Sequence, residues 1–119
     1  MNASELESVD KEKLIHITTI GRKSGKVHTV ELWFAVAGGA VYLSHEGART
    51  DWMKNIDAHA RVGVKVRKLT FEADAEVVKA GAPREEGKKA LYEKYYGPAS
   101  KEVIDDWFSL SQVIQVNPL

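Results

Sequence analysis

The fold of this chain is decided by residues 14–37, which read LIHITTIGRKSGKVHTVELWFAVA. Two apolar runs rich in β-branched residues, 14–20 and 27–37, flank a basic loop that begins at Gly21 and holds a second glycine at Gly25. Apolar runs joined by a short loop with glycines predict a β-hairpin. Because the first run is apolar on both faces apart from three polar positions, we expect it to lie inside a sheet.

Turn residues and periodicity divide the rest of the chain into short elements. Further strands are predicted at residues 40–44, 61–67, 69–78 and 113–116, the first of them after the Gly38-Gly39 turn. Helices are predicted at residues 5–13, at 51–55 with Thr50 or Asp51 as its cap, at 83–96, and from Ser100 onward. Strands interrupted by a few helices predict an α+β domain built on a small antiparallel sheet that closes into a barrel.

Charged residues alternate with apolar ones along the two strands predicted at 61–67 and 69–78. One strand carries a basic row and the other an acidic row, so the charges of the two rows can compensate each other if the strands pair.

The last predicted helix carries an apolar stripe formed by Val103, Ile104, Trp107 and Phe108.

Length and composition exclude several classes of protein. The chain has 119 residues, which is the size of one domain, 1–119, with 1–13 as an N-terminal extension or short helix. Its formal net charge is +0 and it has no cysteine, so disulfides and thiolate metal sites are excluded and no polyanion-binding role is indicated. The sequence shows no signal peptide and no apolar run that predicts a membrane helix. We therefore expect a cytoplasmic protein with no stable membrane insertion.

The loop between the first two strands is the strongest candidate binding site. Arg22, Lys23 and Ser24 offer charge-assisted hydrogen bonds to a phosphate. Thr29, Leu32 and Trp33 follow on the next strand and can form a floor for a flat ring. The alternative interpretation is an ordinary exposed hairpin turn.

Other catalytic chemistries lack their motifs. The four histidines have no metal-ligand spacing, so no metal site is expected. The serine-hydrolase elbow, the dinucleotide fingerprint and the phosphate-binding P-loop are all absent from the sequence.

The residues around this loop resemble a known family. Residues 14–26 are similar to the opening of the deazaflavin-dependent nitroreductase family, and residues 51–56 with 58–62 are similar to its second signature. The resemblance covers roughly residues 14–118. It departs from the family pattern at Glu31, where the family usually has proline.

The resemblance implies a split β-barrel related to the flavin-binding pyridoxamine-phosphate oxidase barrels. It implies binding of the deazaflavin coenzyme F-420, or of FMN as in many relatives. Arg22, Lys23 and Ser24 would hold the phosphate or acidic tail. The implied contacts to the remainder of the cofactor are His28, Thr29, Val30, Leu32, Trp33, Ser44, His45, Trp52 and Asn55.

The resemblance also implies a reaction. Reduced deazaflavin delivers a hydride to an electron-poor small molecule such as a quinone, an activated alkene or a nitroaromatic, while the protein supplies orientation. The catalytic residues stay unknown, with Tyr95, Tyr96 and His45 as candidates for relaying the proton that follows.

Two functions other than catalysis can be weighed from the sequence, namely cofactor carriage and nucleic-acid binding. A flavin or deazaflavin carrier without turnover would need the same binding site. A nucleic-acid module is not expected, because the net charge is zero and no aromatic residues alternate with the cations.

A homodimer is expected, because Trp107, Phe108 and Ile114 are apolar residues that a small barrel leaves partly uncovered.

Overall fold

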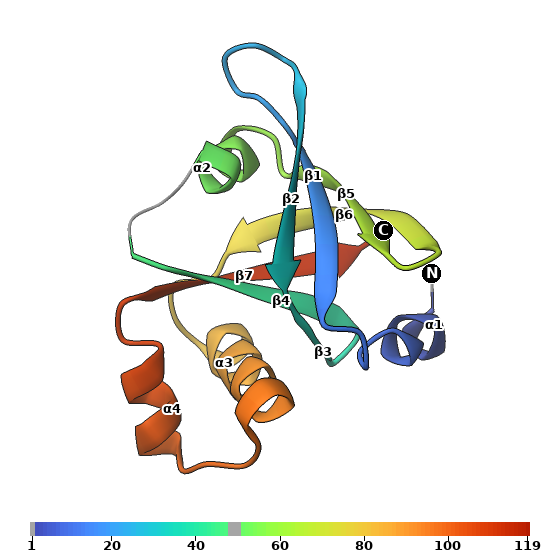
Figure 1. Ribbon diagram of the computed structural model, residues 1–119. Coiled ribbons are helices and arrows are strands. Elements are labelled where there is room, and N and C mark those ends of the chain that lie inside the picture. Colours follow the sequence, from blue (N-terminus) through green and yellow to red (C-terminus); the bar gives the residue numbers. More distant parts are fainter. Residues whose placement is uncertain (1, 48–50) are drawn as a thin grey trace.

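The structure is a computed structural model that describes residues 2–47 and 51–119. Within these residues the chain forms four helices and seven strands (Figure 1). Their order is α1 (Ala3–Ser8), β1 (Leu14–Ile20), β2 (Val27–Trp33), β3 (Ala35–Ala37), β4 (Ala40–Glu46), α2 (Asp51–Ala58), β5 (Arg61–Val66), β6 (Leu69–Val77), α3 (Ala82–Tyr96), α4 (Lys101–Trp107) and β7 (Ser111–Pro118).

The strands form one antiparallel sheet in the order β2-β1-β5-β6-β7-β4-β3. The two edge strands, β2 and β3, are neighbours along the chain, so the sheet curls until its edges approach each other (Figure 1). β1 pairs on both sides, with β2 and with β5. The predicted α+β class and the interior position of the first strand are confirmed.

The prediction of one continuous strand over residues 27–37 is wrong. Phe34 divides it into β2, which pairs with β1, and β3, which pairs with β4. The Tyr95 hydroxyl accepts a hydrogen bond from the Phe34 backbone N–H at 3.0 Å and lies 2.9 Å from the Phe34 carbonyl oxygen. A side chain from α3 therefore satisfies the backbone where the chain passes from one sheet edge to the other.

Two groups of buried side chains hold the fold together. The larger fills the barrel and includes Ile15, Ile17 and Val64 from the sheet together with Trp52 and Ile56 from α2. The predicted inner face of α2 is thereby confirmed, although the helix continues to Ala58 and Thr50 lies outside the described residues. The smaller group lies between the sheet and α3–α4, and contains Tyr42, Leu91, Ile104, Phe108 and Val113.

The helix ends follow the predicted signals. Pro83 lies in the first turn of α3, and Gly97 ends the helix with a φ of 85°. Ser100 caps α4 by accepting a hydrogen bond from the Val103 N–H at 3.3 Å. The predicted apolar stripe on α4 is only half buried, because Ile104 and Phe108 face the core while Val103 and Trp107 are exposed.

The N-terminal segment is built into the barrel. Its helix, α1, ends earlier than predicted, and Leu6 is buried in the main core. The Asp10 carboxylate accepts a hydrogen bond from the Val36 N–H at 2.9 Å, and Glu12 pairs with Arg67 at 3.1 Å. These bonds fix the segment against β3 and the turn after β5.

The predicted pairing of the basic residues of β5 with the acidic residues of β6 is confirmed where β5 begins. Arg61 lies opposite Asp74, and their side chains bond at 2.9 Å. Lys65 lies opposite Thr70 rather than an acidic residue.

Among the residues that the structure describes, no helix is long and apolar enough to cross a membrane.

Candidate cofactor site

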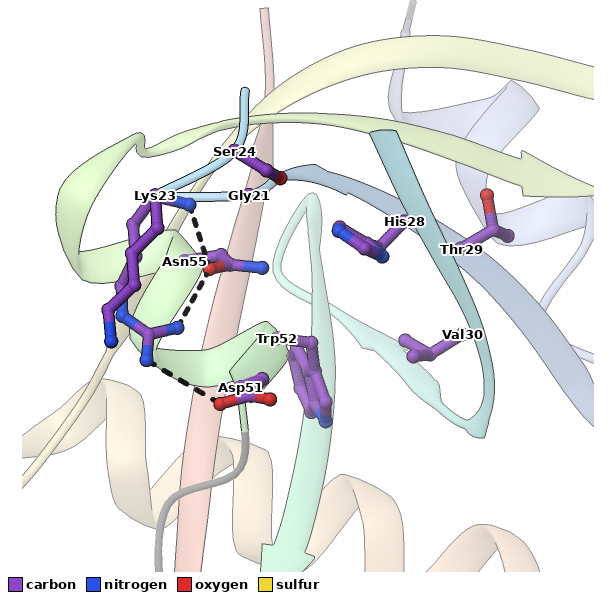
Figure 2. Close-up of a pocket in the computed structure, with 10 residues that line it drawn as sticks. Gly21, Lys23, Ser24, His28, Thr29, Val30, Asp51, Trp52 and Asn55 are labelled. Atoms are coloured by element: carbon purple, nitrogen blue, oxygen red, sulfur yellow. Dashed lines mark hydrogen bonds and ion pairs between the residues drawn. The ribbon is translucent and has the colours of Figure 1, made fainter. Parts of the chain in front are cut away.

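A cavity of ≈ 680 Å³ lies where the β1–β2 loop meets α2. Its volume is in the range of small-molecule sites. The loop contributes cations and a hydroxyl, β2 contributes one wall, and α2 contributes the opposite wall (Figure 2). The lining residues are Gly21, Arg22, Lys23, Ser24, His28, Thr29, Val30, Asp51, Trp52 and Asn55.

Internal hydrogen bonds give the loop its shape. The Gly21 N–H donates to the Lys26 carbonyl at 2.7 Å, and the Ser24 hydroxyl accepts from the Lys26 N–H at 3.2 Å. A Cβ at position 21 would fall 2.8 Å from the Ser24 Oγ and 3.2 Å from the His28 Nε2. A side chain at position 21 would therefore displace the Ser24 hydroxyl and the His28 ring from their places at the start of β2.

Asn55 joins the loop to α2. Its side chain is buried, and its Oδ1 accepts hydrogen bonds from the Arg22 backbone N–H and from the Arg22 Nη1, each at 3.1 Å. The Arg22 Nη2 lies 3.5 Å from the Asp51 Oδ1. Figure 2 shows these bonds as dashed lines between the loop and the helix. The arginine therefore anchors the loop as well as lining the cavity.

The two walls offer apolar surface on either side of the cavity. His28 and Val30 point from β2 toward the side on which the Trp52 indole lies (Figure 2). Thr29 points to the other face of the strand, where its hydroxyl lies 2.9 Å from the Thr18 hydroxyl. An aliphatic side chain and an indole can contact a planar ring, while the loop above them can contact an anion.

The charges in the cavity favour an anion. Lys23 is exposed on the loop, and Arg22 adds a second cation whose side chain keeps 28% of its surface accessible. Asp51, which is 87% exposed, is the acidic residue among those that line the cavity. The balance of two fixed cations against one carboxylate attracts a phosphate or a carboxylate tail.

The structure brings together eight of the predicted site residues, namely Arg22, Lys23, Ser24, His28, Thr29, Val30, Trp52 and Asn55. Leu32 instead packs half-buried against the main core. Trp33 stacks on Tyr95 with ring centroids 4.1 Å apart, and both line a separate pocket with Asp10 and Lys94. Ser44 and His45 lie on β4, opposite Val113 and Gln112.

The three candidates for proton relay lie outside the lining described for this cavity. The Tyr95 hydroxyl is engaged at Phe34 and lies 2.8 Å from the Lys13 carbonyl oxygen, and burial raises the pKa of this phenol. Tyr96 is half-exposed and lies 5.0 Å from Trp107, centroid to centroid.

Two lining residues were missed by sequence reasoning. Gly21 was read as a turn residue, and Asp51 as a helix cap. The acidic charge of Asp51 at the start of the second motif is the signal that could have suggested a role opposite the basic loop, although it does not identify Arg22 as the partner.

Comparison with solved structures defines the class of fold. A conserved hypothetical protein from Mycobacterium tuberculosis is 21% identical over 99% of this chain and 81% of its own, with a TM-score of 0.79. An F420-H2 dependent reductase is 24% identical over 89% of this chain and 95% of its own, with a TM-score of 0.67. A candidate pyridoxamine 5′-phosphate oxidase from Listeria innocua is 12% identical over 97% of this chain and 90% of its own, also at 0.67. At these identities the likeness establishes a shared fold, and the protein is a split β-barrel of the pyridoxamine-phosphate oxidase type.

The sequence itself defines the family. The model of the F420H2-dependent quinone reductase family matches residues 1–102. The chain belongs to this family, and it is an oxidoreductase that uses the deazaflavin coenzyme F-420. A search of curated proteins finds no match to the chain. The resemblance drawn from the two sequence motifs is confirmed.

Proposed function

We propose that the cavity between the β1–β2 loop and α2 binds coenzyme F-420, and that the protein reduces a quinone or another electron-poor small molecule. The observation that carries the proposal is the combination within one cavity of Lys23, Ser24 and Arg22 with the Trp52 indole. This donor set fits a cofactor that joins a planar ring to a phosphate and an acidic tail.

Each wall of the cavity has a distinct role in this proposal. Lys23 and Ser24 bind the anionic part, because an ammonium and a hydroxyl both donate hydrogen bonds to phosphate or carboxylate oxygens. Trp52 and Val30 orient the ring and exclude water from it. Asn55 keeps the loop in place through its two bonds to Arg22.

The chemistry that the protein must add is limited. Reduced coenzyme F-420, when bound, supplies a hydride from its ring carbon. A quinone that accepted this hydride, which carries two electrons and one hydrogen, would take up one further proton to complete the hydroquinone. Side chains of the cavity hold donor and acceptor in contact, which is the main requirement for such a transfer.

We also propose that the protein forms a homodimer. Phe108 and Ile114 do not support it as the sequence suggested, because both are buried within one chain. The support comes from exposed apolar side chains on α3 and α4, where Tyr96 is 51% exposed, Trp107 is 55% exposed and Val103 is also exposed. A second copy would cover this surface. The cytoplasmic location stays a prediction.

The direct test of the function is a turnover assay. Reduced coenzyme F-420 and a soluble quinone are mixed with the protein, and the return of the oxidised cofactor's absorbance is followed. We expect protein-dependent oxidation, and none above the uncatalysed rate with NADH or NADPH in place of the deazaflavin. Binding without oxidation by any quinone or nitroaromatic would indicate a carrier, and tight binding of FMN with none of coenzyme F-420 would overturn the proposal.

A further inference from the structure

Asp51 occupies the place on Arg22 that an anionic ligand would need. The guanidinium of Arg22 uses Nη1 for the buried Asn55 carboxamide and directs Nη2 to the Asp51 carboxylate at 3.5 Å. These two partners differ in their surroundings, because Asn55 is buried within the fold while Asp51 is largely exposed. The bond to Asn55 is structural, and the ion pair with Asp51 can be exchanged for another anion.

We propose that Asp51 is a specificity-determining residue that competes with the bound anion for Arg22. The inference rests on the proposed function of the cavity and deepens it. An exposed ion pair contributes little to stability, so an incoming phosphate can displace the carboxylate at small cost. The carboxylate still repels that phosphate, and this lowers the affinity of the site for anions.

The competition also directs where the ligand's charge is placed. Asp51 lies at the start of α2, so negative charge is disfavoured on the helix side of the cavity. Lys23 and Ser24 belong to the loop, whereas Asp51, the acidic residue of the lining, belongs to α2. The anionic part of the ligand is therefore held on the loop side, and its ring lies toward Trp52.

The test uses the full chain with two probes, inorganic pyrophosphate and oxidised coenzyme F-420, each titrated by calorimetry. Asp51→Asn removes the charge and nearly keeps the size and shape of the side chain. We expect this variant to bind pyrophosphate about three- to tenfold more tightly at low salt. The gain should shrink at high salt, because screening weakens the repulsion that was removed.

Two controls isolate the route through Arg22. Asp106→Asn removes the same charge from an exposed position on α4 and should leave pyrophosphate affinity unchanged. In an Arg22→Gln background, Asp51→Asn should gain less than in the wild-type background, because the competition for Arg22 is absent and only the direct repulsion between the carboxylate and the anion is removed.

The outcomes separate this inference from the proposed function. Tighter pyrophosphate binding by Asp51→Asn, with no coenzyme F-420 bound by either protein, supports the role of Asp51 and overturns the proposed function. Equal or weaker pyrophosphate binding by Asp51→Asn, an equal gain from Asp106→Asn, or no pyrophosphate binding at all overturns the role of Asp51. If Asp51→Asn binds pyrophosphate equally or more weakly, or if Asp106→Asn gives an equal gain, the proposed function still stands provided that coenzyme F-420 binds.

Discussion

At the scale of single residues, the Tyr95 side chain stabilises the junction between β2 and β3, where the chain passes from one edge of the sheet to the other. The Tyr95 hydroxyl meets the backbone of Phe34 and of Lys13, which are 61 and 82 residues away along the chain. Phe34 is buried, so its N–H has no access to water. The tyrosine was a candidate for catalysis from its sequence position, and the structure places it in the architecture of β2 and β3.

Tyr95→Phe should therefore lower stability. Removing the hydroxyl leaves the buried Phe34 N–H without its acceptor, which costs about 1–3 kcal/mol. Tyr96→Phe is the matched control on the same helix and should change stability by less than about 0.5 kcal/mol, because its side chain is half-exposed. Urea unfolding measures both, and equal stability of the two variants would contradict the assignment.

The same pair carries a prediction about pH. Burial is the largest cause that raises the pKa of Tyr95, with a smaller contribution from Asp10. A raised phenol pKa means that folding favours the protonated form, so this contribution is complete below the unfolded pKa of about 10 and is lost as pH rises through the folded pKa. The stability difference between wild type and Tyr95→Phe should shrink in that alkaline range, and a difference that grows there would contradict the sign.

At the scale of elements, α3 packs so closely on the sheet that one position must be glycine. A Cβ at position 87 would fall 2.5 Å from the Tyr42 Cδ1 and 3.0 Å from its Cγ. The Tyr42 ring cannot easily move away, because it is buried and its hydroxyl accepts a bond from the Gln115 Nε2 at 3.1 Å. The contact thus sets the distance between the helix and β4.

Gly87→Ala should consequently destabilise the protein. Helix propensity alone favours alanine by about 1 kcal/mol, but overpacking of a core costs typically about 1–3 kcal/mol and should win. Lys89→Ala, an exposed change on the same helix, serves as the control and should be nearly neutral. A higher melting temperature for Gly87→Ala would show that the helix can move outward without cost.

The helices and strands show which features of the fold could be predicted from the sequence and which could not. Pro83, Gly97 and Ser100 fixed the ends of α3 and α4, because their signals are local. The break at Phe34 could not be predicted, since residues 27–37 contain no proline or glycine and read as one strand. The break depends on barrel closure and on Tyr95, and both are long-range features.

The same distinction applies to the site. Arg22, Lys23 and Ser24 share one loop, so their grouping was predictable from adjacency. Trp33 was expected in the site because it follows Thr29 on one strand, yet it stacks on α3. The partners of Arg22 lie in α2, about 30 residues further along the chain, and no local pattern determines such a pairing.

At the scale of the whole molecule, the exposed aromatic surface predicts association. Sedimentation of the wild type at micromolar concentration should give a mass near two chains. Trp107→Glu places a charge on that surface and should give a mass near one chain, with the fold intact because the side chain is 55% exposed. Leu119→Glu, an equivalent change at the exposed C-terminus, should leave the dimer unchanged, and a monomeric wild type would contradict the proposal.

The central claim is that the cavity between the β1–β2 loop and α2 holds the anionic part of coenzyme F-420. Its most direct test is the Kd of the cofactor for wild type, Lys23→Ala and Lys68→Ala, measured at low and at high salt. Lys23→Ala removes an exposed cation from the cavity, whereas Lys68→Ala removes one from the distant turn between β5 and β6. The account predicts that Lys23→Ala weakens binding about three- to thirtyfold at low salt and depends less steeply on salt than the wild type, while Lys68→Ala matches the wild type. Equal Kd values and equal salt slopes for all three proteins would contradict it.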